Sequence, residues 1–160
     1  MSGKADFSVD EWDLLRSSPL MASMLVVAAS PSGPVGLVQE SSATAKTILQ
    51  TVATAQTPLL KALSEDVTQT MAIPKPPPGA TPGQVQDAAA EILRRTSALL
   101  TTKASPEETA EIKGWLAKVA QATAEAAKEG GFLGFGGASV SDQEKAALAM
   151  LNAALGLGTA

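Results

Sequence analysis

Hydrophobic residues recur along most of this chain at three- and four-residue steps, with polar residues between them. An α-helix turns once in about 3.6 residues, so this spacing gathers the apolar side chains on one helical face. In residues 36–56 that face is predicted to hold Leu37, Val38, Ala45, Ile48, Leu49 and Val52, and the opposite face Glu40, Lys46 and Gln50. No segment alternates convincingly with the period of a β-strand. The pattern therefore predicts an all-α bundle of about six or seven helices.

The expected helices fall between turn-forming stretches rich in proline and glycine. They are expected over 9–17, 19–29, 36–56, 58–72, 81–103, 106–129 and 142–155. Residues 19–29 are apolar nearly all round, which is typical of a central buried helix, and Pro19 is taken as the restart after a break. Residues 30–36 read as a turn throughout, and the break at Pro58 is either a helix end or a kink.

Three serine-to-glutamate pairs at a three-residue spacing mark helix starts with capping boxes. The pairs are Ser8 with Glu11, Ser105 with Glu108, and Ser141 with Glu144. Gly156 is expected to end the last helix, because glycine readily adopts the left-handed conformation found there. Residues before Phe7 are expected to be unordered.

The proline-rich stretch 73–83 divides the chain nearly in half. It cannot be helix or central strand, so it is expected to be an extended linker between residues 7–72 and 84–157 of one domain, 1–160. A proline-rich ligand for another protein is the alternative, but only Lys75 supplies a basic residue. Residues 19–57 and 106–155 share a helix, loop, helix plan and are two possible pseudo-equivalent hairpins.

The amino-acid composition limits the kinds of core, binding partner and location that we expect for this protein. Apolar residues make up 45% but aromatic residues only 3%, so the core is expected from Ala, Leu, Val and Met. The net charge is −4 and no basic stripe is visible, which argues against nucleic acid. The absence of cysteine fits a reducing compartment, and no targeting or membrane-spanning segment is visible, so we expect a cytoplasmic protein.

The chain contains no histidine, cysteine or tyrosine, which removes most catalytic and metal-binding templates. The remaining acidic residues cluster at helix starts, where they complement the helix dipole. We therefore expect no catalytic residues, no cofactor and no dedicated metal site. A carboxylate-only enzyme or metal binder is the least favoured hypothesis.

A glycine-rich apolar loop at residues 130–137 is the most unusual segment. Its glycines follow a helix and lack the lysine and serine or threonine of a phosphate-binding loop, so a phosphate cradle is disfavoured. Phe132, Leu133 and Phe135 are expected either to plug the core, the preferred interpretation, or to form an exposed tip that binds a partner. Trp115 has the same two interpretations, with the core anchor first.

The motif "EGGFLGFGGASVSDQEKAAL", with the opening "FSVDEWDLLRSSPLMASMLVVAASPSGPVG", resembles a small family of uncharacterised bacterial helical proteins nearly from end to end. The resemblance implies a bacterial origin and a helical fold, and no activity. The helix layout also resembles the TerB-like tellurite-resistance fold, whose hairpin loops carry acidic residues thought to hold metal. The corresponding loops here carry Pro, Ser, Gly and Phe, so no site residue transfers.

These observations favour a non-enzymatic interaction or scaffold protein that acts through an apolar surface or the loop 130–137. Its partner would be an unidentified protein or a second copy, with Phe132, Leu133, Phe135 and Trp115 as the contact residues. The alternative is a carrier of a small apolar ligand or lipid, with a cavity beneath the helix of residues 19–29. Membrane-surface action through the loop is opposed by the acidic net charge.

Overall fold

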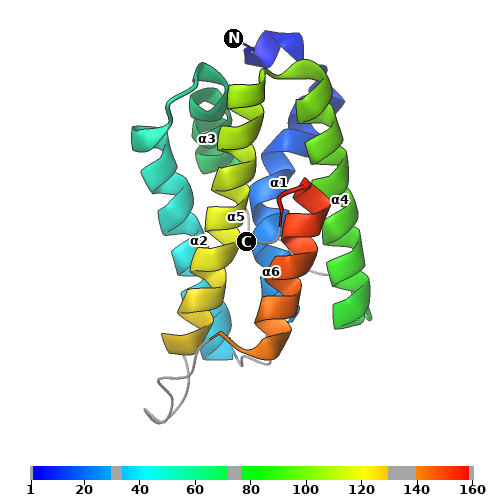
Figure 1. The fold of residues 1–160 in the computed structure, drawn as a ribbon. Coiled ribbons are helices and arrows are strands. Elements are labelled where there is room, and N and C mark those ends of the chain that lie inside the picture. The colour runs from blue at the N-terminus through cyan, green and yellow to red at the C-terminus, as the bar shows by residue number, and fades with distance from the viewer. Residues whose placement is uncertain (1, 30–33, 72–76, 130–139, 159–160) are drawn as a thin grey trace.

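The computed structural model describes residues 2–29, 34–71, 77–129 and 140–158, with residues 34–39 and 127–129 given by backbone alone (Figure 1). A short 3-10 helix, Lys4–Asp6, precedes six α-helices. They are α1 (Val9–Val27), α2 (Pro34–Thr54), α3 (Pro58–Thr70), α4 (Pro82–Lys103), α5 (Pro106–Glu129) and α6 (Asp142–Leu155). The described residues contain no strand, so the predicted all-α bundle is confirmed.

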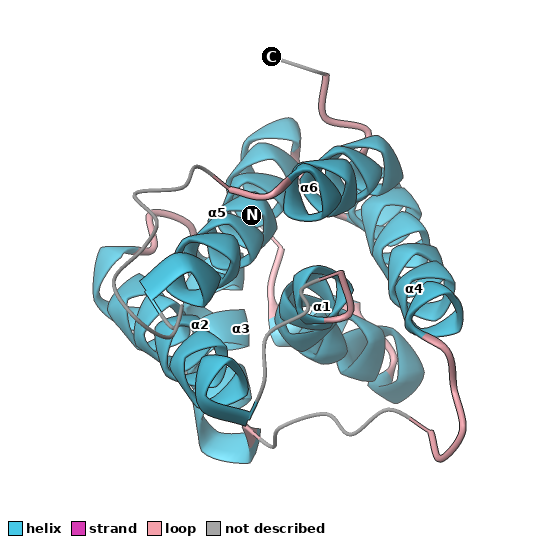
Figure 2. Ribbon diagram, turned by 90° about the horizontal axis from the view of Figure 1, so that it is seen from below, coloured by secondary structure: helices cyan, strands magenta, loops and turns pink. Residues whose placement is uncertain are grey.

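Helix α1 is the centre of the bundle. It contacts each of the other five helices, and Figure 2 shows them arranged around it. Leu15, Ala22, Leu25 and Val26 of α1 are fully buried. The most extensive contacts join α1 to α4 and α2 to α5, so the two sequence halves share one core. The equivalence of the two hairpins stays a prediction.

The predicted break at Pro19 is wrong, because α1 continues from Val9 to Val27 with Pro19 inside it. Proline has no amide hydrogen and cannot donate to the carbonyl of Leu15, four residues earlier. The hydroxyl of Ser18 donates to that carbonyl instead, at 2.6 Å. The side chain before the proline thus supplies the missing hydrogen bond, and two expected helices become one.

Helix α2 begins at Pro34, so the predicted turn over residues 30–36 ends earlier than expected; residues 30–33 lie outside the described ranges. Proline at the first helical position costs little, because that amide has no partner within the helix.

The break expected at Pro58 is a helix end and not a kink, because α2 ends at Thr54 and α3 begins at Pro58. Glu111 of α5 holds this connection by accepting hydrogen bonds from the amides of Gln56 and Thr57.

The predicted inner face of α2 is partly wrong. Glu40 is fully buried, whereas Leu49 is 52% exposed. The buried positions follow a different stripe at four- and three-residue steps, namely Glu40, Thr44, Thr47, Ile48 and Thr51. The three threonine hydroxyls on this stripe each donate to the carbonyl four residues earlier, which satisfies them locally and leaves their methyl groups to pack.

A buried cluster of hydroxyl groups joins α1, α2 and α5. Thr44 Oγ1 lies 2.7 Å from Ser23 Oγ and 2.9 Å from Thr123 Oγ1. Thr123 Oγ1 also lies 2.9 Å from the carbonyl oxygen of Val119, which competes with Thr44 Oγ1 as an acceptor for the single Thr123 hydroxyl proton. Because buried polar groups are costly unless they are hydrogen-bonded, this cluster favours one alignment of the three helices over others.

The helix ends agree well with the sequence. All three predicted capping boxes form, and Gly156 adopts a left-handed conformation with φ of 67° after α6. A fourth box, Thr81 with Gln84 at the start of α4, uses Gln in place of Glu. The predicted inner residues of α3 and α5 are also confirmed, since Leu59, Leu63, Ile112 and Leu116 are fully buried.

Residues 2–6 are ordered, contrary to the expectation for the segment before Phe7. Phe7 is buried and lies 5.9 Å from the Trp12 ring, measured between ring centroids. The Lys4 ammonium and the Trp12 indole nitrogen both donate to Asp66 of α3, at 2.5 and 2.7 Å. The amide of Ser2 donates to Glu108 of α5 at 2.7 Å. These contacts fasten the N-terminal segment to three helices.

We call residues 2–7, together with the side chains of Trp12, Asp66 and Glu108 that hold them, the N-terminal clasp. Its two carboxylates, Asp66 and Glu108, have pKa values below their ordinary range. The Lys4 ammonium, followed by the Trp12 indole, lowers the pKa of Asp66. Burial raises the pKa of Glu108, but amide donors from Ser105 and Ser2 outweigh it, so the net shift is downward. Both carboxylates therefore stabilise the fold as anions.

Removing the Ser18 hydroxyl is expected to destabilise the protein through α1. In Ser18→Ala the Leu15 carbonyl loses its donor inside the core, at a cost of about 1–3 kcal/mol. Ser17→Ala is the matched control, because the Leu14 carbonyl that Ser17 contacts at 2.8 Å still faces the amide of residue 18. The free energy of unfolding is measured by urea denaturation followed by circular dichroism.

A double-mutant cycle tests whether Ser18→Ala destabilises the protein because Pro19 lacks an amide donor. Ala at position 19 restores an amide donor, so Ser18→Ala is expected to cost less beside Pro19→Ala than beside Pro19. Equal costs in the two backgrounds would contradict the role assigned to the Ser18 hydroxyl.

Acid is expected to weaken the N-terminal clasp through Asp66. Because the folded-state pKa is lowered, the stabilisation is complete above the unfolded-state value of 3.8 and is lost as the pH falls through the lower folded-state value. Asp66→Asn should therefore be less stable than the wild type by about 1 kcal/mol at pH 7, and the difference should shrink as the pH falls below 3.8 and through the lower folded-state value. Urea denaturation across this pH range measures it.

The neighbouring exposed residue provides the control for Asp66. Glu65→Gln should change the free energy of unfolding by less than about 0.5 kcal/mol at every pH. A difference between Asp66→Asn and wild type that stays constant with pH would show that the carboxylate charge is irrelevant to the clasp.

Candidate functional site

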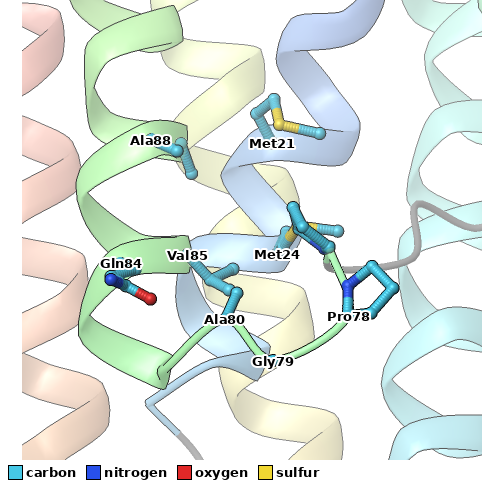
Figure 3. Close-up of a pocket in the computed structure, with 10 residues that line it drawn as sticks. Met21, Met24, Pro78, Gly79, Ala80, Gln84, Val85 and Ala88 are labelled. Atoms are coloured by element: carbon cyan, nitrogen blue, oxygen red, sulfur yellow. The ribbon is translucent and has the colours of Figure 1, made fainter.

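An apolar groove of about 500 Å³ lies between the C-terminal half of α1 and the first turns of α4 (Figure 3). Met21 and Met24 form the α1 side. Residues Gln84, Val85, Ala88 and Ala89 form the α4 side, and the turn Pro77–Ala80 closes one end. Figure 3 shows Met21 and Met24 on α1 and Gln84, Val85 and Ala88 on the neighbouring α4, with the turn at one end.

The sequence of the closing turn determines its conformation. The amide of Ala80 donates to the carbonyl of Pro77 at 3.1 Å, and Gly79 has φ of 79°. Proline at the second position and a positive φ at the third are the requirements of a type II turn, which Pro78 and Gly79 meet. The Thr81 capping box follows directly, so the end wall and the start of α4 are fixed together.

The two long walls differ in side-chain size. Met21 and Met24 lie one helical turn apart on α1 and are both half-buried. Methionine has three rotatable bonds and a polarisable sulfur, so this wall adapts to what lies against it. Across the groove, Ala88 and Ala89 contribute only methyl groups. The space exists because small side chains of α4 stand opposite flexible ones of α1.

The described residues that line the groove carry no formal charge. None of these ten residues is acidic or basic, and Gln84 has the one polar side chain among them. The Gln84 carbonyl oxygen already accepts the Thr81 amide at 3.0 Å. The lining offers neither a nucleophile nor a general acid or base, so its chemistry suits binding by apolar contact.

A second cleft, of about 240 Å³, is lined by residues of the N-terminal clasp, including Phe7, Val9 and Trp12. Its two cations are already paired within the chain: Lys4 with Asp66, and Arg16 with Asp13 at 2.7 Å. This cleft is therefore accounted for by the packing of the N-terminal segment.

Of the residues predicted from sequence to contact a partner, only Trp115 is among the described residues, and it does not line the groove. Phe132, Leu133 and Phe135 lie outside the described residues. Trp115 is only 4% exposed and belongs to the hydrophobic core, which agrees with the interpretation as a core anchor and gives a partner no access to its ring.

The groove residues themselves carried little signal in the sequence. Met21 and Met24 fall in the helix of residues 19–29, beneath which the carrier hypothesis placed a cavity. Val85 and Ala88 were visible only as parts of a helical pattern. The Pro77–Ala80 turn was read as linker, and only the packing of α4 on α1 makes it an end wall.

The described residues also bear on metal and membrane binding. No group of three or more acidic side chains among them is placed to hold a metal ion. None of their helices is both long enough and apolar enough to cross a membrane.

Comparisons of the chain with protein-family models, with curated proteins and with solved structures find no match. The two resemblances drawn from sequence motifs and helix layout therefore stay predictions.

Proposed function

We propose that this protein binds a small apolar ligand in the groove between α1 and α4 and acts as a non-enzymatic carrier or sensor of that ligand. The observation that supports the proposal is the uncharged groove with Met21 and Met24 on one wall. It lies along the helix beneath which the sequence placed a ligand cavity.

The size of the groove favours a small molecule over a protein partner. Ligand sites commonly have volumes of about 300–1,000 Å³, and this groove falls in that range. A stable protein interface uses about 20 to 30 residues on each side, whereas ten residues line the groove. A protein segment that entered it would need further contacts elsewhere.

The interaction or scaffold hypothesis rests mainly on Phe132, Leu133 and Phe135, which lie outside the described residues, and so stays a prediction. The cytoplasmic location also stays a prediction. The proposal keeps the non-enzymatic interpretation, because the chain lacks His, Cys and Tyr and the groove lining has no titratable group.

A bulky side chain at Ala88 is expected to fill the groove and block binding. Ala88 is exposed and lines the groove, so Ala88→Trp occupies the ligand space without disturbing the core. The probe is Nile red, a neutral apolar dye whose fluorescence rises in apolar surroundings. The wild type should bind it with saturation at one site, and Ala88→Trp should weaken the affinity about tenfold or more, equivalent to about 1.4 kcal/mol.

The matched control is Ala98→Trp, at an exposed position of the same helix outside the groove. It should bind Nile red like the wild type, and circular dichroism should show equal helicity in all three proteins. Native mass spectrometry of freshly purified wild type should also show added mass that Ala88→Trp lacks. Equal dye affinity in the two tryptophan variants, or no saturable binding by the wild type, would rule out the groove as the site.

A further inference from the structure

The groove has a chemistry that narrows its ligand. We infer that it holds the hydrocarbon chain of a monomeric single-chain amphiphile and does not recognise the charge of the headgroup. The inference rests on the proposed function and specifies its ligand class.

The lining of the groove is unsuited to a charged headgroup. A site that selects a carboxylate, phosphate or ammonium group places an opposite charge or several hydrogen-bonding groups beside it. Among the described residues the groove lining has no charged side chain, and the carbonyl oxygen of its single amide side chain, Gln84, is engaged by the Thr81 amide, which leaves only the Gln84 Nε2 hydrogens as side-chain donors. Burying an ionic headgroup there would cost free energy that this one neutral group would not offset. The headgroup therefore remains in water, and the chain alone is bound.

The shape of the groove suits a linear hydrocarbon chain. The lining residues follow the seam between two neighbouring helices, with Met21 and Met24 along one side and Val85 and Ala88 along the other (Figure 3). The Pro77–Ala80 turn closes one end, so the space is a trough with a stop. A trough between helices fits a flexible linear chain, and the methionine wall adjusts to its exact path.

The charge of the groove and of the whole chain favours a free amphiphile over a membrane surface as the ligand. Peripheral proteins that dock on anionic membranes do so with clusters of Lys and Arg. No basic residue is among the described residues that line the groove, and the chain as a whole has a net charge of −4. The ligand is therefore a single molecule in solution and not a bilayer surface.

The test is displacement of Nile red from the wild-type protein by ten-carbon amphiphiles below their micelle-forming concentrations. The three headgroups are decanoate, decanol and decyltrimethylammonium, which are negative, neutral and positive at pH 7.5. Their affinities should agree within about threefold. Shortening the chain from ten to six carbons should weaken binding by about fourfold for each methylene removed, in proportion to the apolar surface withdrawn from water.

Ala88→Trp and Ala98→Trp locate the effect, as in the dye experiment. Ala88→Trp should weaken all three amphiphiles alike, and Ala98→Trp none of them. Phosphatidylcholine vesicles, with and without anionic phosphatidylserine, should not co-sediment the wild-type protein.

Different failures overturn different statements. If decanoate or decyltrimethylammonium binds tenfold more tightly than decanol, and Ala88→Trp abolishes the binding, the groove is a ligand site but the headgroup is recognised, and this inference is wrong. Co-sedimentation with vesicles that Ala88→Trp abolishes would make a membrane the ligand and overturn the inference in another way. If no amphiphile displaces the dye and the dye itself does not depend on Ala88, the proposed function fails as well.

Discussion

The fold depends on the continuity of α1 through Pro19. Proline within a helix removes one hydrogen bond and crowds the carbonyl four residues earlier, and it commonly ends the helix. Here the Ser18 hydroxyl donates to that Leu15 carbonyl, so the break does not occur. Helix α1 contacts every other helix, and its contacts with α4 are among the most extensive in the bundle, so two separate segments in its place would disrupt this packing. One side-chain hydrogen bond thus allows a single continuous helix to organise the core.

The same principle, hydroxyl groups satisfied by nearby carbonyls, explains the unusual polarity of the interior. Thr44, Thr47 and Thr51 of α2 return their hydroxyls to their own helix and present methyl groups to the core. A threonine bonded in this way packs much as valine does, while its hydroxyl can still meet a second partner. Thr44 does so with Ser23 and Thr123, and the three helices are joined by contacts that apolar side chains could not provide. Specific polar contacts therefore compensate in part for the scarcity of aromatic residues in the core.

The predictability of the structure follows from how local each signal is. Capping boxes depend on residues three positions apart, so Ser8, Ser105 and Ser141 marked their helix starts correctly. The continuity at Pro19 also had a local signal, a serine immediately before the proline, but a rule based on proline alone overlooks it. The buried stripe of α2 was missed because a hydropathy pattern counts Thr44 as polar and Leu49 as apolar, whatever their hydrogen bonds. The order of the N-terminal segment depends on Asp66 and Glu108, which are distant in sequence, so no local pattern indicated their contacts with that segment.

The groove could be anticipated only in part, for a related reason. Periodicity placed Met21 and Met24 on the central helix, but the space beside them depends on which residues α4 brings opposite. Ala89 and Ala90 are buried and let α4 approach α1 closely, while the neighbouring Ala88 faces outward and is too small to cover the methionines. A larger residue at that one position would complete an ordinary helix contact and leave no site. The protein instead keeps flexible apolar side chains half-exposed beside a fixed turn. Filling that space with a hydrocarbon chain would remove the remaining apolar surface from water, which is a physical reason for a ligand to bind there.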